Sequence, residues 1–142
     1  MGIFDSLDVS ASGLIAERTR MDVTSQNLAN AQSTGYKRQD VVLRQANGGF
    51  ANVLGKAIGA SDSKSTPGGV EVQQVVTDTA PQRKVYDPGH PDADAQGYVE
   101  LPNVNAVSEM TDLISASRAY EANVTALNTA KQMFSKTLEI LR

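Results

Sequence analysis

The sequence predicts a mainly α-helical protein with a small β part, in which long helices from the two ends of the chain pack as a hairpin or coiled coil. Apolar residues recur at steps of three and four at both ends of the chain. Between the ends, short alternating runs are separated by Gly and Pro. We therefore expect an N-terminal helix over residues 1–34, a loop-rich antiparallel β region over 35–103, and a C-terminal helix over 104–142.

The longest apolar stripe runs through residues 104–142, which contain no Gly or Pro. Its members are Met110, Leu113, Ser117, Tyr120, Val124, Leu127, Lys131, Phe134, Leu138 and Leu141. At about 1.5 Å per residue this helix would be roughly 55 Å long, which is more than a globule of this size needs. Asn105 is the predicted N-cap. Two interpretations stay open: a helix that is buried in an assembly, and an amphipathic helix on an ordinary bundle.

A second apolar stripe, thinner than that of residues 104–142, runs through residues 3–30. Its members are Phe4, Leu7, Ala11, Leu14, Arg18, Met21, Ser25 and Leu28. Because Gly costs about 1 kcal/mol relative to Ala inside a helix, Gly13 predicts an interruption near residues 10–13. Such a helix is marginal alone in water. We therefore expect it to lie against the C-terminal helix, where the two stripes bury each other.

The N-terminal helix is predicted to end near Asn30, before a turn at Thr34 and Gly35 in which the glycine takes a positive φ. Asn27 and Asn30 are three residues apart and therefore share one helix face. Each amide offers a donor and an acceptor. We expect both side chains to bridge the backbone of a neighbouring element.

Four short runs between the helices are rich in Val or other strand-forming residues. They are residues 38–44, 70–76, 83–86 and 98–101. The turn at 79–82 predicts that run 83–86 returns along run 70–76, so that a single small antiparallel sheet forms. Residues 47–69 are rich in Gly, Ala and Ser and predict a loop.

Composition excludes several classes of function. The chain has 142 residues, a net charge of −3 and scattered basic residues, so it lacks the electrostatic footprint of a nucleic-acid-binding protein. It has no Cys, and therefore no disulfide, thiolate zinc site or cysteine nucleophile. The first residues do not form a secretory signal peptide, and no apolar run approaches the length of a membrane span.

The chain also offers little for catalysis. His90 is the only histidine, and it lies in a loop rich in Pro and Gly. The run DADAQG from Asp92 matches the first half of a calcium-binding loop, but its twelfth position is Asn103 instead of a bidentate Glu. A solvated, rigid turn is the alternative role for this loop. We predict that the chain is not an enzyme and has no catalytic residue, no cofactor, no metal and no small-molecule substrate.

Three stretches resemble the bacterial flagellar basal-body rod protein family. Residues 27–37, with Asn27, Asn30, Thr34, Gly35 and Tyr36, resemble the N-terminal signature shared by axial proteins of the rod and hook. Residues 85–105 and 115–131 are similar to the proximal-rod members of this family. The resemblance covers residues 1–141 and is weakest over 47–69. Many relatives place one more residue between the Thr and Gly of the signature turn.

The resemblance implies a structural subunit of the proximal rod, the drive shaft that transmits torque and encloses the export channel. It implies that the terminal helices polymerise as the rod core. The implied partners are other proximal and distal rod proteins, the rod-base adaptor, the membrane ring and the flagellar type III export apparatus. The implied location is the basal-body rod that crosses the periplasm, reached by export without a cleaved signal peptide.

We interpret the apolar stripes as a subunit-packing seam and the signature segments as a joint between subunits. The predicted seam is Leu7, Leu14, Met21, Leu28, Leu113, Tyr120, Val124, Leu127, Phe134 and Leu138. The predicted joint is Asn27, Asn30, Thr34, Gly35, Tyr36, Asp87, His90, Asp94, Gly97 and Tyr98. Two hypotheses from other classes compete with this one: a cytoplasmic helical adaptor or export chaperone, and a metal-dependent enzyme built on the His90 loop.

Overall fold

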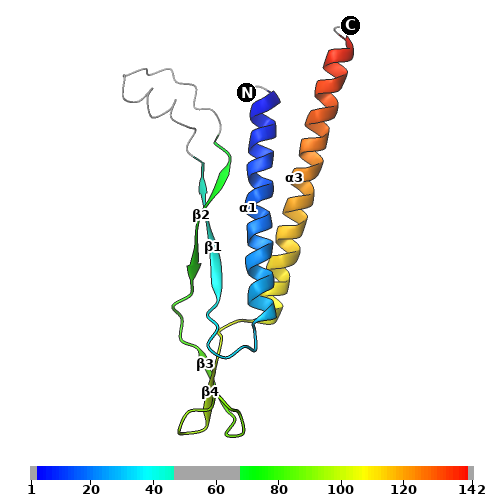
Figure 1. The fold of residues 1–142 in the computed structure, drawn as a ribbon. Coiled ribbons are helices and arrows are strands. Elements are labelled where there is room, and N and C mark those ends of the chain that lie inside the picture. Colours follow the sequence, from blue (N-terminus) through cyan, green and yellow to red (C-terminus); the bar gives the residue numbers. More distant parts are fainter. Residues whose placement is uncertain (1–2, 47–67, 141–142) are drawn as a thin grey trace, which may run out of the picture.

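Two long helices lie side by side in the computed structural model, which describes residues 3–46 and 68–140 (Figure 1). Between α1 (Ile3–Ala29) and α3 (Ala106–Ile140) the chain forms β1 (Gln39–Gln45), β2 (Val70–Thr77), β3 (Arg83–Tyr86) and β4 (Tyr98–Leu101). The predicted mainly α fold with a small β part is confirmed. In the described ranges, no helix is long and apolar enough to cross a membrane.

The two helices form an antiparallel hairpin. α3 begins where predicted, because the Asn105 side-chain oxygen accepts a hydrogen bond from the Val107 N–H at 3.0 Å. α1, however, runs through Gly13 without a break, so the predicted interruption is wrong. A Cβ at Gly13 would lie 2.9 Å from the Asn123 amide nitrogen of α3. The glycine therefore permits a close helix–helix approach, and this packing offsets its low helix propensity.

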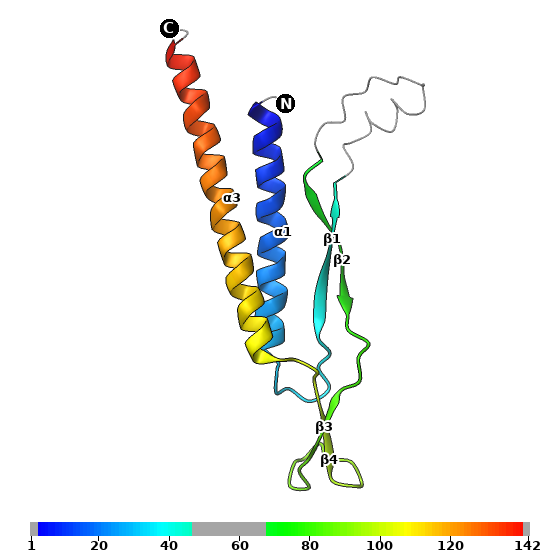
Figure 2. The ribbon, with the colours of Figure 1, turned by 180° about the vertical axis from the view of Figure 1, so that it is seen from behind.

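α1 occupies the middle of the molecule, with α3 on one side and the β1–β2 ribbon on the other, in both the front and back views (Figures 1 and 2). Its buried residues are Ala16, Val23, Thr24 and Asn27. On α3, Ala116 and Glu109 are buried. The contact between these elements therefore consists of small apolar and polar side chains rather than a large apolar core.

The four strands form two separate two-stranded antiparallel sheets. β1 pairs with β2 over the full length of both strands, with an irregularity between Val42 and Leu43, and β3 pairs with β4. The predicted strands are confirmed within a residue or two. The predicted return of β3 along β2 is wrong, because β2 pairs with β1 and β3 pairs with β4. Most of the predicted loop, residues 47–67, lies outside the described residues.

The ribbon is attached to α1 at Gly69. Here the Ser12 hydroxyl oxygen accepts a hydrogen bond from the Val70 N–H at 3.0 Å and donates one to the Val9 carbonyl at 2.7 Å. A Cβ at Gly69 would lie 1.9 Å from the Ser12 Oγ atom and 2.8 Å from its Cβ atom. The ribbon can approach α1 this closely only because position 69 has no side chain.

We expect Gly69→Ala to lower the free energy of unfolding by about 1–3 kcal/mol, because the ribbon must move away from α1 to make room for the methyl group. Urea unfolding followed by circular dichroism measures this loss. Gly89→Ala is the matched control, since its Cβ would meet only an Asp87 carboxylate oxygen at 3.6 Å. Equal unfolding midpoints for the two variants would contradict the close contact at Gly69.

Candidate assembly surface and junction

The predicted seam residues lie in two half-covered rows. The half-buried members are Leu7, Leu14, Met21 and Leu28 on α1 and Leu113, Tyr120, Val124 and Leu127 on α3. Phe134 and Leu138, near the end of α3, are 37% and 53% exposed. None of the ten is fully buried. A single chain therefore covers the seam only in part.

Both rows border the groove between α1 and α3 on the side away from the ribbon. At about 100° per residue, the α1 row lies roughly 140–180° from Ser12, which binds the ribbon. The α3 row lies roughly 0–80° from Ala116. Asp112, on the opposite flank of α3, lines a hollow together with residues of β1. The two rows thus run side by side along the line where the two helices meet.

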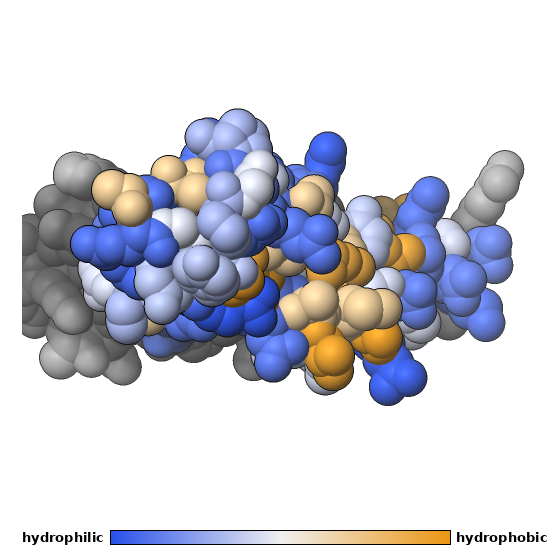
Figure 3. Space-filling view, turned by 90° about the horizontal axis from the view of Figure 1, so that it is seen from below, coloured by the Kyte–Doolittle hydropathy of each residue, from blue (hydrophilic) through white to orange (hydrophobic). Residues whose placement is uncertain are grey.

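The lower end of α3 exposes a further apolar patch that the seam prediction did not contain. Val107 is 74% exposed, and Met110 and Ile114 are each 53% exposed. Figure 3, the view from the lower end, shows apolar side chains gathered on the helix side of the hydrophilic hairpin tip. The spacing of three and four residues was the signal for this patch, and of its members only Met110 was included in the predicted stripe.

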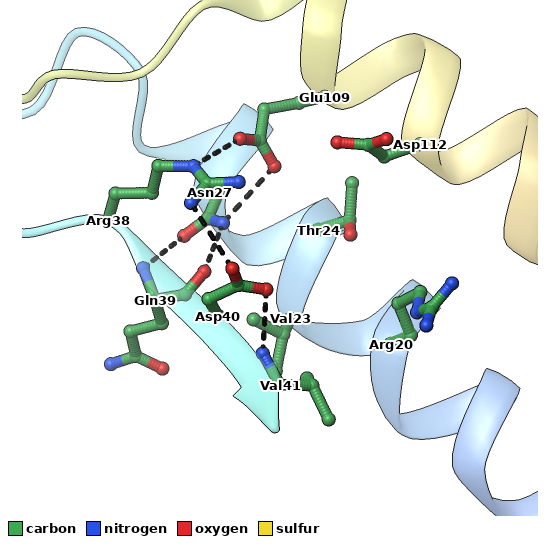
Figure 4. Close-up of a pocket in the computed structure, with 10 residues that line it drawn as sticks. All are labelled: Arg20, Val23, Thr24, Asn27, Arg38, Gln39, Asp40, Val41, Glu109 and Asp112. Atoms are coloured by element: carbon green, nitrogen blue, oxygen red, sulfur yellow. Dashed lines mark hydrogen bonds and ion pairs between the residues drawn. The ribbon is translucent and has the colours of Figure 1, made fainter. Parts of the chain in front are cut away.

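The predicted joint residue Asn27 lies at the centre of a buried polar junction (Figure 4). The side chain is 1% exposed and uses both of its donors and both acceptor positions. Its oxygen accepts from the Gln39 N–H at 2.9 Å and from the Tyr36 hydroxyl at 2.8 Å. Its nitrogen donates to the Gln39 carbonyl at 2.7 Å and to the Glu109 carboxylate at 3.2 Å. Asn27 therefore joins α1, β1 and α3.

An ion pair completes this junction. Glu109, in the first turn of α3, is 2% exposed and accepts a hydrogen bond from Arg38 Nε at 2.7 Å. That bond raises the pKa of Arg38 above its ordinary value. Burial, together with the negative charge of Glu109, raises the pKa of Tyr36. Arg38 and Glu109 were missed as site residues because each reads as an ordinary charged residue until the chain brings them together.

A hollow of about 240 Å³ lies beside the junction. It is lined by Arg20, Val23, Thr24, Asn27, Arg38, Gln39, Asp40, Val41, Glu109 and Asp112 (Figure 4). Within it, Arg38 pairs with Glu109 and also lies 3.7 Å from an Asp40 carboxylate oxygen. The hollow thus lies where α1, β1 and α3 are joined.

Asn30 does not reach a neighbouring element, so that part of the prediction is wrong. Its amide nitrogen donates to the Gln26 carbonyl of its own helix at 2.9 Å, and its oxygen accepts from the Ser33 hydroxyl at 3.1 Å. Thr34, by contrast, donates to an Asp92 carboxylate oxygen at 2.8 Å. Gly35 has the predicted positive φ, 75°. The turn after α1 is therefore tied to the β3–β4 hairpin through Thr34.

The other predicted joint residues lie in the loop of the β3–β4 hairpin, which projects below the helices (Figure 1). The Asp94 carboxylate accepts hydrogen bonds from the N–H groups of Gln96, at 2.8 Å, and Tyr98, at 2.9 Å. Gly97 has a φ of 81°. The rings of Tyr98 and Tyr86 make an edge contact with centroids 5.4 Å apart. Asp94 thus stabilises the turn between the strands.

His90 and Asp87 also act within this loop. The His90 Nδ1 atom accepts a hydrogen bond from the Asp92 N–H at 3.1 Å, and an Asp87 carboxylate oxygen accepts one from the Gly89 N–H at 3.2 Å. Across residues 3–46 and 68–140, no group of three His, Cys, Asp or Glu side chains is arranged to hold a metal ion.

The order of this loop should depend on pH. The two N–H groups bonded to Asp94 lower its pKa in the folded state. Stabilisation by Asp94 is therefore present above the ordinary Asp pKa of the unfolded chain and is lost as the pH falls through the lowered folded-state value. On acidification we expect the Gln96 and Tyr98 amide signals in NMR spectra to lose their hydrogen-bonded shifts. Asp94→Asn should abolish this pH dependence. Amide shifts that titrate equally in the variant would contradict it.

Two family models match the chain. A model described as "Flagella basal body rod protein" matches residues 7–37, which include most of α1 and the turn after it. A model described as "Flagellar basal body rod FlgEFG protein C-terminal" matches residues 95–140, which include β4 and α3. The two matches therefore contain most of both helices and, of the junction, Asn27, Tyr36 and Glu109.

Curated relatives match over the whole chain. The flagellar basal-body rod protein FlgC of Bacillus subtilis is 45% identical over 150 aligned residues, covering 99% of both chains. That of Borreliella burgdorferi is 42% identical, covering 100% of this chain and 99% of the relative. That of Salmonella typhimurium is 40% identical, covering 99% of this chain and 98% of the relative. Identity at this level over the full length shows that the chain belongs to the FlgC family of flagellar basal-body rod proteins.

Proposed function

We propose that this structural rod subunit assembles into the proximal rod through the groove between α1 and α3. The observation that carries the proposal is that both apolar rows of the predicted seam remain half-covered in a single chain. Burial of apolar area contributes about 25 cal/mol per Å², so a neighbouring helix that fills the groove gains stability along its whole length. A repeated heterologous contact of this kind generates a helical tube, the shape that a hollow drive shaft requires.

The junction has a complementary role in this proposal. It connects the helices, which would form the rod core, to the β region between them. Asn27, Tyr36, Arg38 and Glu109 hold the end of α1, the start of β1 and the start of α3 together, and Thr34 links the same region to the hairpin loop. Torque that reaches one element would thus be transmitted to the others without bending the chain between them.

The same proposal includes the partners and the location. The subunit would contact other proximal and distal rod proteins, the rod-base adaptor and the membrane ring. It would reach the periplasm through the flagellar type III export apparatus, without cleavage of a signal peptide. Among the side chains of the helix pair that the structure describes, no large apolar one is fully buried, which suits a chain that must unfold to pass through a narrow channel.

The deciding experiment is deletion of the gene in its host, followed by electron microscopy of isolated basal bodies and a swimming assay. We expect membrane rings without a completed rod and non-motile cells, with both defects repaired by the intact chain. Complete rods and hooks in the deletion strain would contradict the proposal. That outcome would favour a helical adaptor that remains in the cytoplasm.

A further inference from the structure

Glu17 has an incomplete set of partners in the groove between the helices. It lies three residues after Leu14 and four before Met21, so it shares their face of α1. Within the described chain its buried Oε2 atom has no hydrogen-bond donor, and the nearest cation, Arg20, is 3.7 Å away. A buried carboxylate oxygen without a donor costs roughly 1–3 kcal/mol or more. The side chain as a whole is 15% exposed, and a donor from outside the chain reaches the buried Oε2 atom once the carboxylate turns outward.

Arg118 is a cation of opposite charge that is available to a neighbouring subunit. It is exposed, and its guanidinium makes no hydrogen bond or ion pair with the described residues. It also lies at the height of Glu17 along the helix pair. Gly13 meets Asn123, and in an antiparallel pair each step forward along α1 is a step back along α3, so residue 17 lies opposite residue 119. Arg118, however, lies roughly 160° around α3 from Ala116 and faces away from α1.

Because Arg118 and Glu17 lie at similar heights on different faces, they meet when a second copy lies beside the first with only a small axial displacement. We propose that Glu17 binds Arg118 of a neighbouring copy and that this ion pair sets the axial register between side-by-side subunits. The inference rests on the proposed function, since it assumes that the groove is an assembly surface. It adds that a second copy of the chain fills the groove and that this residue pair aligns the two copies.

The exposed Arg18 is the alternative donor, but it would build a different assembly. Arg18 directly follows Glu17 on α1, so a contact in which the Glu17 of each copy meets the Arg18 of the other would be isologous and would close after two subunits. Glu17 and Arg118 lie on different sides of the helix pair, and their contact is heterologous. Only a heterologous contact continues around a tube.

Charge reversal tests the pair in the deletion strain. Glu17→Arg and Arg118→Glu should each abolish swimming and rod completion, and the double variant should restore both. Glu17→Arg combined with Arg18→Glu is the matched control and should stay non-motile. Failure of the Glu17→Arg/Arg118→Glu variant to recover, or recovery through Arg18→Glu instead, would overturn the assignment.

Cross-linking provides a second measurement that does not depend on motility. The chain has no natural Cys, so Glu17→Cys/Arg118→Cys introduces the only thiols. Mild oxidation of isolated basal bodies should yield disulfide-linked ladders of this chain, whereas Arg18→Cys/Arg118→Cys should not. Basal bodies that contain the subunit but give no ladder would refute the contact and leave the rod function intact. A deletion strain with complete rods would refute the rod function itself.

Discussion

Asn27→Ala is expected to lower the free energy of unfolding by on the order of 3 kcal/mol. The substitution removes four hydrogen bonds at once and leaves the Gln39 N–H and carbonyl, the Tyr36 hydroxyl and one Glu109 oxygen without their partner. Because these groups are at least partly buried, water cannot fully replace the lost amide. Urea unfolding of the purified chain measures the loss, and reduced swimming in the complemented deletion strain reports its effect on assembly.

Asn30→Ala is the control for this prediction. The Asn30 amide bonds only to the Gln26 carbonyl of its own helix and to the Ser33 hydroxyl. Its removal should cost about 0.5–1 kcal/mol, the usual net contribution of an accessible hydrogen bond. If the two alanine variants unfold at the same urea concentration, the junction is not what holds the three elements together.

Leu127→Asp is expected to abolish rod assembly while the chain is still produced and exported. Leu127 is half-buried in the α3 row of the groove. A carboxylate at this position would have to be desolvated when a neighbouring helix covers it, which costs several kcal/mol per contact. Each subunit in the rod would repeat that cost. Electron microscopy of basal bodies and the swimming assay record the outcome.

Asn128→Asp places the same charge one residue further along, on an exposed face of α3. It should leave swimming and rods close to normal, because its carboxylate remains in water. Normal rods with Leu127→Asp would remove the α3 row from the assembly surface. Loss of rods with both variants would mean that α3 tolerates no added negative charge, whichever face carries it.

The helices and strands could be located from the sequence because their signals are local. The steps of three and four through Leu113, Tyr120 and Leu127 define α3, and the Asn105 cap marks its start. The Val-rich runs define the strands in the same way. Each of these signals involves residues that are only a few positions apart in the sequence. It can therefore be recognised without knowing the rest of the structure.

The errors arose where the outcome depends on residues far apart in the chain. Gly13 predicts a helix break until Asn123 is known to lie against it. The predicted partner of β2 was wrong because β2 pairs with β1, which precedes it by about 25 residues and is held against α1 through Asn27. Arg38 and Glu109 are 71 residues apart, and periodicity carries no information about such pairs. Sequence patterns thus indicated the elements, whereas long-range polar contacts decided how the elements are joined.

The scarcity of large buried apolar side chains also affects the temperature dependence of stability. The largest fully buried side chains are Glu109 and Asn27, and the neighbouring buried residues of the helix pair are mainly Ala, Val and Thr. Unfolding raises the heat capacity through apolar exposure and lowers it through polar exposure. A contact zone of this composition gives a small heat-capacity change and hence a flat stability curve. The stability of this contact zone should therefore change little with temperature.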